Sequence, residues 1–82
     1  MHRVIWDSEA VDQLQRIYDE AFDKEAVVNA VTRVGLELAA LPTDAGESRE
    51  EGSRILFKYP IIVWFRHSER MRDVVVFRVR GY

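Results

Sequence analysis

Near the end of this 82-residue chain, the run Asp73-Val74-Val75-Val76-Phe77-Arg78-Val79-Arg80 has the composition of a β-strand. Successive side chains of a β-strand point to opposite faces, so Val75, Phe77 and Val79 are expected on one face. The other face would then carry Val74, Val76, Arg78 and Arg80. One uniformly apolar face and one partly basic face predict a sheet that other elements cover on one side.

Two more strand-like runs, Arg54–Tyr59 and Ile61–Arg66, come before this stretch. Pro60 cannot donate to a ladder and should mark a bulge, a bend or an edge position, and His67–Arg72 is expected to be a turn. The uniformly apolar, odd-numbered side chains are the predicted core face: Ile55, Phe57, Ile61, Val63, Phe65, Val75, Phe77 and Val79. The opposite face is expected to hold Leu56, Ile62, Trp64, Val74 and Val76 among Arg54, Lys58, Arg66, Arg78 and Arg80.

The first half of the chain predicts a strand and two helices. Residues 3–6 are rich in strand formers and are followed by Asp7 and Ser8, either of which can cap a helix. Apolar residues then recur at helical spacing over residues 8–22 and again over residues 24–41, with Asp23 as the second cap. Pro42 is expected to end the second helix, and residues 43–53 read as an exposed loop.

Together these elements predict one domain, residues 1–82, of the α+β class. We expect an N-terminal strand and an antiparallel helical hairpin packed on one face of an antiparallel β-sheet, in two layers. Both helices are used on the core face, so the second face is expected to stay uncovered. An uncovered apolar patch with a basic rim is typical of a partner site, and we expect Leu56 and Trp64 to contact another chain there.

Charge is distributed unevenly along the chain. The 12 basic and 14 acidic residues give a net charge of −2, but residues 1–52 carry 5 basic and 12 acidic residues, and residues 53–82 carry 7 and 2. This favours a local anionic contact over general attraction to nucleic acid or membrane. The chain has no cysteine, and no apolar run suggests a signal peptide or membrane span, which predicts a cytoplasmic protein. His2 and His67 lack ligand spacing, so we expect no metal site and no cofactor.

Several short patterns, taken together, resemble the RelE/ParE toxin superfamily, the toxins of bacterial toxin–antitoxin or plasmid stabilisation modules. They are Val4-Ile5-Trp6 before Ser8-Glu9-Ala10, Leu14-x-x-Ile17, Leu38-x-x-Leu41-Pro42, Gly52-x-Arg54-x-Leu56, Ile62-Val63-Trp64-Phe65-Arg66 and Val74-Val75-Val76-Phe77-Arg78-Val79. The resemblance covers nearly the whole chain. It implies a small toxin that an antitoxin holds inactive through an extended, often acidic tail.

The resemblance implies one of two activities. RelE-like members are ribosome-dependent mRNA endoribonucleases, and matching their pattern makes Arg54, Lys58, Arg80 and Tyr82 the candidate catalytic residues. The arginine usually found entering the next strand is replaced by Ile61-Ile62, and most of the family's C-terminal segment is missing after Tyr82, which we expect to be a frayed end. ParE-like members lack the catalytic set and bind DNA gyrase.

The incomplete set favours a ParE-like toxin that acts by protein binding. The partner-binding residues would be Leu56, Ile62, Trp64, Arg66, Arg78 and Arg80. Expected partners are a cognate antitoxin with an acidic and apolar segment, a gyrase-type target and a second copy of the chain. A RelE-like endoribonuclease is one alternative. Another is a degenerate member that keeps the fold and an interface but neither activity.

Overall fold

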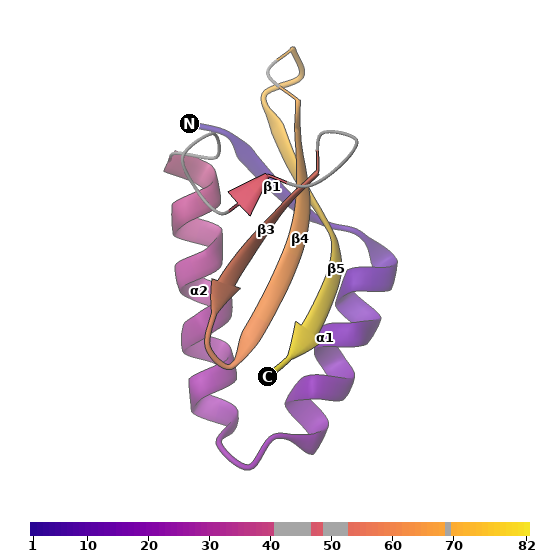
Figure 1. Ribbon diagram of the computed structural model, residues 1–82, viewed down its shortest axis with the longest axis vertical. Helices are drawn as coiled ribbons and strands as arrows, with labels where there is room; N and C mark the ends of the chain where they lie inside the picture. The colour runs from indigo at the N-terminus through magenta and orange to yellow at the C-terminus, as the bar shows by residue number, and fades with distance from the viewer. Residues whose placement is uncertain (41–46, 49–52, 69) are drawn as a thin grey trace.

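A computed structural model describes residues 1–40, 47–48, 53–68 and 70–82 of the chain. Two helices pack on one face of a five-stranded sheet with the strand order β1-β5-β4-β3-β2 (Figure 1). The elements are β1 (Arg3–Trp6), α1 (Ser8–Glu20), α2 (Lys24–Ala40), β2 (Glu47–Ser48), β3 (Ser53–Lys58), β4 (Ile61–Ser68) and β5 (Asp73–Gly81). The predicted two-layer α+β class is confirmed.

The sheet is mixed, so the prediction of an antiparallel sheet is wrong for one strand. The pairs β2–β3, β3–β4 and β4–β5 are antiparallel, whereas β1 runs parallel to β5, with Val4 opposite Val74. The helical hairpin causes this arrangement, since it returns the chain to the end of the sheet where it began. There the His2 N–H donates to the Ala39 carbonyl at 2.9 Å. Strand β3 then runs in the direction of β1, β4 runs back, and β5 again runs in the direction of β1.

Both predicted helix starts are confirmed by the caps that form them. Asp7 Oδ1 accepts the Ala10 N–H at 2.9 Å, and Asp23 Oδ1 accepts the Ala26 N–H at 3.1 Å. Helix α1 ends two residues earlier than predicted. Its last carbonyls are satisfied by Lys24, whose Nζ donates to the carbonyl of Tyr18 at 2.9 Å. Leu41, the last residue of the second predicted helix, lies outside the described residues.

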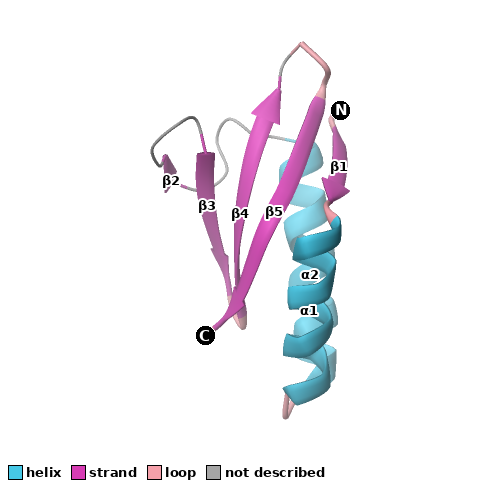
Figure 2. Cartoon of the chain, turned by 90° about the vertical axis from the view of Figure 1, so that its right-hand side faces the viewer, coloured by secondary structure: helices cyan, strands magenta, loops and turns pink. Residues whose placement is uncertain are grey.

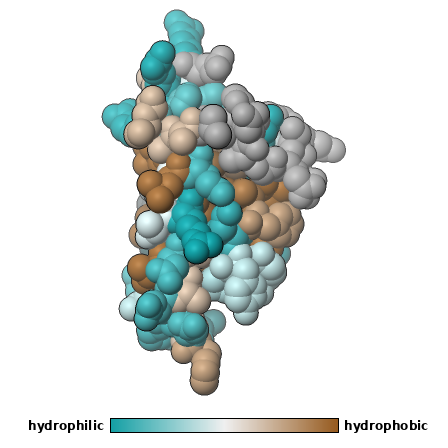
Figure 3. Space-filling view, turned by 90° about the vertical axis from the view of Figure 1, so that its left-hand side faces the viewer, coloured by the Kyte–Doolittle hydropathy of each residue, from teal (hydrophilic) through white to brown (hydrophobic). Residues whose placement is uncertain are grey.

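The core lies between the helices and one face of the sheet (Figure 2). Its buried members are Ala10, Ala30, Val34 and Leu38 from the helices and Leu56, Ile61, Val63, Phe65, Val74, Val76 and Val79 from the strands. Among the described residues no buried side chain is polar or charged. On the side of the molecule that carries α2, hydrophilic side chains run down the middle and hydrophobic ones lie on either side of them (Figure 3).

The predicted core face is correct for β4 and wrong for β3. Leu56 is buried in the core, and Phe57 is 46% exposed on the opposite face. Ile55 is buried as predicted, but it lies on the same face as Phe57, opposite Trp64. The cause is the two-residue turn at Tyr59 and Pro60, which places Lys58 opposite Ile61. Residues opposite each other share a face, so odd-numbered side chains of β4 face the core together with even-numbered side chains of β3. The predicted bend at Pro60 is confirmed.

A β-bulge changes the core face along β5. Val63 lies opposite Val79, but Phe65 lies opposite Val76, and Phe77 is the extra residue between them. Beyond the bulge Val76 and Val74 therefore point into the core, and Phe77 does not. The predicted core positions of Val75 and Phe77 are wrong for this reason, whereas Val79 is correct.

Strand β1 covers only part of the edge of β5. The Asp7 N–H donates to the Val76 carbonyl at 3.0 Å, where β1 gives way to α1. Farther along, Gln13 Oε1 accepts the Val79 N–H at 2.7 Å. A side chain of α1 thus replaces a strand partner for a backbone donor that would otherwise lack one.

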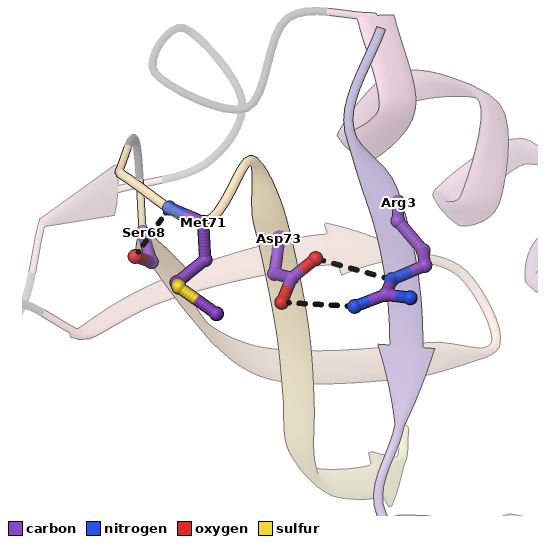
Figure 4. Close-up of polar contacts among 4 residues, drawn as sticks. All are labelled: Arg3, Ser68, Met71 and Asp73. Atoms are coloured by element: carbon purple, nitrogen blue, oxygen red, sulfur yellow. Dashed lines mark hydrogen bonds and ion pairs between the residues drawn. The ribbon is translucent and has the colours of Figure 1, made fainter.

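The two ends of the β4–β5 connection are fixed by polar contacts (Figure 4). Arg3 donates to both carboxylate oxygens of Asp73, at 3.1 and 3.3 Å, and Ser68 Oγ accepts the Met71 N–H at 3.3 Å. The predicted turn over residues 67–72 is shorter in the structure, because β4 continues to Ser68. In the predicted loop, Glu47–Ser48 pairs with β3, and residues 43–46 and 49–52 lie outside the described residues.

Candidate functional site

The face of the sheet turned away from the helices is the candidate site. No described helix covers it (Figure 2). Strand register assigns to it side chains from three neighbouring strands, which we call the open face: Ile55 and Phe57 of β3; Ile62, Trp64 and Arg66 of β4; Val75, Phe77, Arg78 and Arg80 of β5. Of these, Ile55 is buried, with 5% of its surface exposed. The three arginines are exposed, and Ile62, Trp64, Val75 and Phe77 are half-buried. The site combines aromatic surface with positive charge.

Two arginines of the open face lie over aromatic rings. The guanidinium carbon of Arg78 is 4.9 Å from the centre of the Trp64 ring, and that of Arg66 is 4.6 Å from the centre of the Phe77 ring. The bulge makes this possible, because it puts Phe77 and Arg78 on the same face of β5. A guanidinium that stacks on a ring keeps its N–H donors in its own plane, where they can meet a carboxylate. Each pair therefore offers an apolar surface and a forked donor together.

One end of the open face carries a neutral ion pair. There the carboxylate of Asp73 is paired with Arg3 through two hydrogen bonds (Figure 4). Arg80 lies near the other end, opposite Ile62. A ligand with carboxylates and apolar side chains would fit the middle of the face, between these two positions.

Most of the predicted partner-binding residues are brought together by the structure. Ile62, Trp64, Arg66, Arg78 and Arg80 share the open face. Leu56 does not belong to the site, because it lies on the other side of β3 in the core. Phe57 and Phe77 also belong to the open face, although alternation along the strands predicted both in the core. The length of the β3–β4 turn is the one feature that could have shown that Phe57 faces away from the core. No feature of the sequence marks the bulge at Phe77.

The candidate ribonuclease residues are not brought together. Lys58 lies on the helix side of the sheet, where its Nζ pairs with Glu37 Oε1 of α2 at 2.8 Å. Arg54 also lies on that side, because it is opposite the buried Phe65. Arg80 is on the open face. The sheet itself separates the candidate cations.

Tyr82 is not a frayed end. Its N–H donates to the Pro60 carbonyl at 3.0 Å. Its ring is perpendicular to the rings of Phe57, at 5.9 Å, and Tyr59, at 5.5 Å. This contact joins the end of β5 to the β3–β4 turn, an association that the sequence analysis did not foresee.

His2 and His67, far apart in the sequence, lie together in the structure. Their rings are 4.6 Å apart in an edge-to-face arrangement. Nowhere in the described part of the chain do three or more histidine or carboxylate side chains gather as a set of metal ligands. Within the same described ranges, no helix is long and apolar enough to cross a membrane.

Comparisons with known proteins identify the fold. No family model and no curated protein sequence matches the chain. Among solved structures, a chain of the toxin–antitoxin complex RelBE2 from Mycobacterium tuberculosis aligns over 99% of this chain and 91% of its own length, with a TM-score of 0.78 and 17% identity. A chain of the chromosomal ParDE toxin–antitoxin system from P. aeruginosa aligns over 99% and 96%, with a TM-score of 0.74 and 21% identity.

A chain of the intact E. coli RelBE toxin–antitoxin complex aligns over the whole of this chain and 98% of its own length, with a TM-score of 0.73 and 12% identity. Systems of both the RelE and the ParE type thus occur among the similar structures. The likeness covers the helical hairpin and the sheet together. The chain has the RelE/ParE-like fold.

Proposed function

We propose that this protein is the toxin of a toxin–antitoxin module, that it acts by binding a protein target of the gyrase type, and that an antitoxin neutralises it by covering the open face. The observation that carries this proposal is the open face itself, where the guanidinium groups of Arg78 and Arg66 lie over the rings of Trp64 and Phe77. The similar structures support an antitoxin partner, because they are taken from toxin–antitoxin complexes.

The chemistry of the open face favours a partner segment that is both acidic and apolar. Arg78 and Arg66 provide donors for carboxylates, and the rings beneath them provide apolar surface. Tryptophan and arginine are the residues most often found to dominate binding energy at protein interfaces. An acidic segment also complements the last 30 residues, which hold 7 basic and 2 acidic side chains.

The positions of the cations argue against ribonuclease activity. Cleavage of RNA by its 2′-hydroxyl needs a base, an acid and cationic donors within hydrogen-bond reach of one phosphate. Arg54 and Lys58 lie on the opposite side of the sheet from Arg80, and Lys58 is paired with Glu37. The Tyr82 ring packs against other aromatic rings. These four residues do not surround a common point.

Antitoxin binding can be tested with a short acidic protein, should the neighbouring reading frame encode one, or with a synthetic peptide that combines acidic and apolar residues. Trp6→Phe would leave Trp64 as the only tryptophan, so its emission would report on the open face. We expect the antitoxin segment to change this emission and Arg78→Ala to weaken binding about 10- to 100-fold, as loss of a central arginine does at other interfaces. Arg70→Ala, an exposed arginine in the β4–β5 turn, is the matched control and should have little effect. Unchanged emission would refute the proposed site.

The target can be tested with two activity assays on the purified protein. We expect inhibition of DNA supercoiling by gyrase and no cleavage of mRNA, either free or on translating ribosomes. Cleavage of ribosome-bound mRNA that disappears in Arg80→Ala would instead assign RelE-like ribonuclease activity. Antitoxin binding without either activity would identify a degenerate member that keeps only the interface.

A further inference from the structure

A cleft of about 550 Å³ lies at the end of the molecule opposite the β4–β5 turn. Its walls are the link between α1 and α2 on one side and the β3–β4 turn with the end of β5 on the other (Figure 1). The side chains that matter here are Glu20, Phe22, Asp23, Tyr59 and Tyr82, and we call this feature the end cleft. It adjoins the open face, because the Tyr82 ring that lines it also contacts the ring of Phe57.

Aromatic rings form the strand side of the end cleft. The rings of Tyr59 and Tyr82 stand at 84° to each other with their centres 5.5 Å apart. Two perpendicular rings make a corner, and a cation in such a corner can meet the π face of one ring while it contacts the second. On the helix side, Phe22 is fully exposed to solvent. A large exposed ring beside an aromatic corner suggests a surface that a ligand covers.

The charged side chains that line the end cleft are acidic. They are Glu20 and Asp23, both exposed. The neighbouring cation, Lys24, is not among the residues that line the cleft. Its Nζ donates to the carbonyls of Tyr18, Asp19 and Ala21 and lies 5.2 Å from the centre of the Tyr18 ring, so these contacts hold it at the end of α1. The lining combines π faces with negative charge.

We propose that the end cleft binds the cationic side chain of an arginine or lysine that a partner polypeptide presents. Carboxylates and aromatic faces both attract a cation, and they favour it over a neutral side chain of similar shape. A polypeptide fits better than a free small cation, because residues that flank the cation can cover Phe22 and Tyr59. The site has the opposite charge from the open face, so the two surfaces select different segments. The inference does not depend on the proposed toxin function.

The test uses a blocked pentapeptide with a central arginine flanked by leucines, titrated into the ¹⁵N-labelled full chain. Amide shifts are expected at the residues around the cleft: Ala21, Phe22, Asp23, Gly81 and Tyr82. The same peptide with neutral citrulline should bind at least about tenfold more weakly, and Tyr82→Ala should lose about fivefold in affinity for the arginine peptide, as expected for one aromatic wall. Equal binding of the two peptides, or shifts confined to other surfaces, would overturn the proposal.

The carboxylates can be tested without disturbing the helices. In a Glu20→Gln, Asp23→Asn double variant, the new asparagine side chain can still cap α2 as Asp23 does through its bond to the Ala26 N–H, because asparagine is as good a cap as aspartate. We expect about tenfold weaker binding of the arginine peptide, whereas Glu25→Gln, an exposed acid in the first turn of α2, should change it little. An equal loss in both variants would mean that general charge attracts the peptide and would overturn the site.

Two further experiments test other occupants of the end cleft, a free small cation and a second copy of this chain. Tetramethylammonium that binds as tightly as the arginine peptide would assign the cleft to a free small cation and overturn the polypeptide proposal. Self-association at rising protein concentration that disappears in the double variant would assign it to a second copy of this chain. We expect weak tetramethylammonium binding and no such self-association.

Discussion

The two faces of the sheet are built from similar residues but differ in how far these residues are buried. Val63, Phe65 and Val76 on one face are fully buried, while Ile62, Trp64 and Phe77, their neighbours in the sequence, remain half-buried on the other. Both sets are apolar and typical of strands. The helices cover one set and not the other because of the register of the strands. The number of apolar residues does not explain the difference, since it is similar on both faces.

Arginines distinguish the open face from the covered one. On the covered face, helices α1 and α2 exclude water, and no buried side chain among the described residues is polar. On the open face, Arg66 and Arg78 lie over the rings that would otherwise meet water. Stacked guanidinium groups cover apolar surface while they stay hydrated, so the face can remain exposed until a partner replaces water.

A charge on each face gives the largest expected contrast. Val63→Asp places a carboxylate at a position with no exposed surface, and the cost of several kcal/mol is comparable to the whole stability of a small domain, roughly 5–15 kcal/mol. We expect this variant to lose its near-UV circular dichroism and cooperative unfolding. Ile62→Asp, one residue away on the open face, should cost less than about 1 kcal/mol. Similar losses in both variants would contradict the assignment of the two faces.

Substitutions of two adjacent residues of β3 test which side of this strand faces the core, where the structure reverses the predicted assignment. Leu56→Ala should lower the free energy of unfolding by about 2–4 kcal/mol, because it leaves a cavity in the core. Phe57→Ala should lower it by less than about 1 kcal/mol despite the larger side chain, because Phe57 is on the open face. Urea unfolding monitored by circular dichroism would measure both. A larger loss of stability in Phe57→Ala than in Leu56→Ala would mean that Phe57 faces the core, as alternation along the strand had predicted.

The fold was predictable because its signals are local. Helical spacing and the Asp7 and Asp23 caps located both helices to within two residues among the described positions, and runs of strand formers located β1, β3, β4 and β5. The uncovered second face was predicted because the sequence indicates two helices and both were assigned to the core face. Trp64 and Arg78 were both predicted on that face, and the pairing of β4 with β5 places them there.

The remaining parts depend on how strands meet. Alternation fixes which residues of one strand share a face, but only pairing relates one strand to the next. The turn at Tyr59 and Pro60 reversed the assignment for β3, and the bulge at Phe77 reversed it along half of β5. The direction of β1 and the aromatic contacts of Tyr82 are also long-range features. They determine which candidate residues share a site.

Replacement of Gln13 is expected to change the stability by an intermediate amount. Gln13 lies at the edge of the sheet, where neither face protects the backbone. Its side chain accepts the Val79 N–H at 2.7 Å in a partly buried position, so Gln13→Ala should cost about 1–2 kcal/mol for the unpaired donor. The Val79 amide should also exchange faster with solvent. Gln15→Ala, which removes an exposed bond to Asp19, should stay within about 0.5 kcal/mol of the original stability. Unchanged exchange at Val79 would show that the Gln13 bond does not protect this edge.

The smallest expected effect tests whether the helical layer can be strengthened independently of the open face. Gly35 lies inside α2, and a Cβ added there meets no atom within 4 Å. Gly35→Ala should therefore raise the free energy of unfolding by about 0.5–1 kcal/mol, because alanine loses less backbone freedom than glycine on entering a helix. The urea midpoint should rise with an unchanged slope, while antitoxin binding at the open face stays the same. Weaker binding in this variant would show that α2 and the open face are coupled through the sheet, and a lower midpoint would show that α2 needs the freedom of glycine at this position.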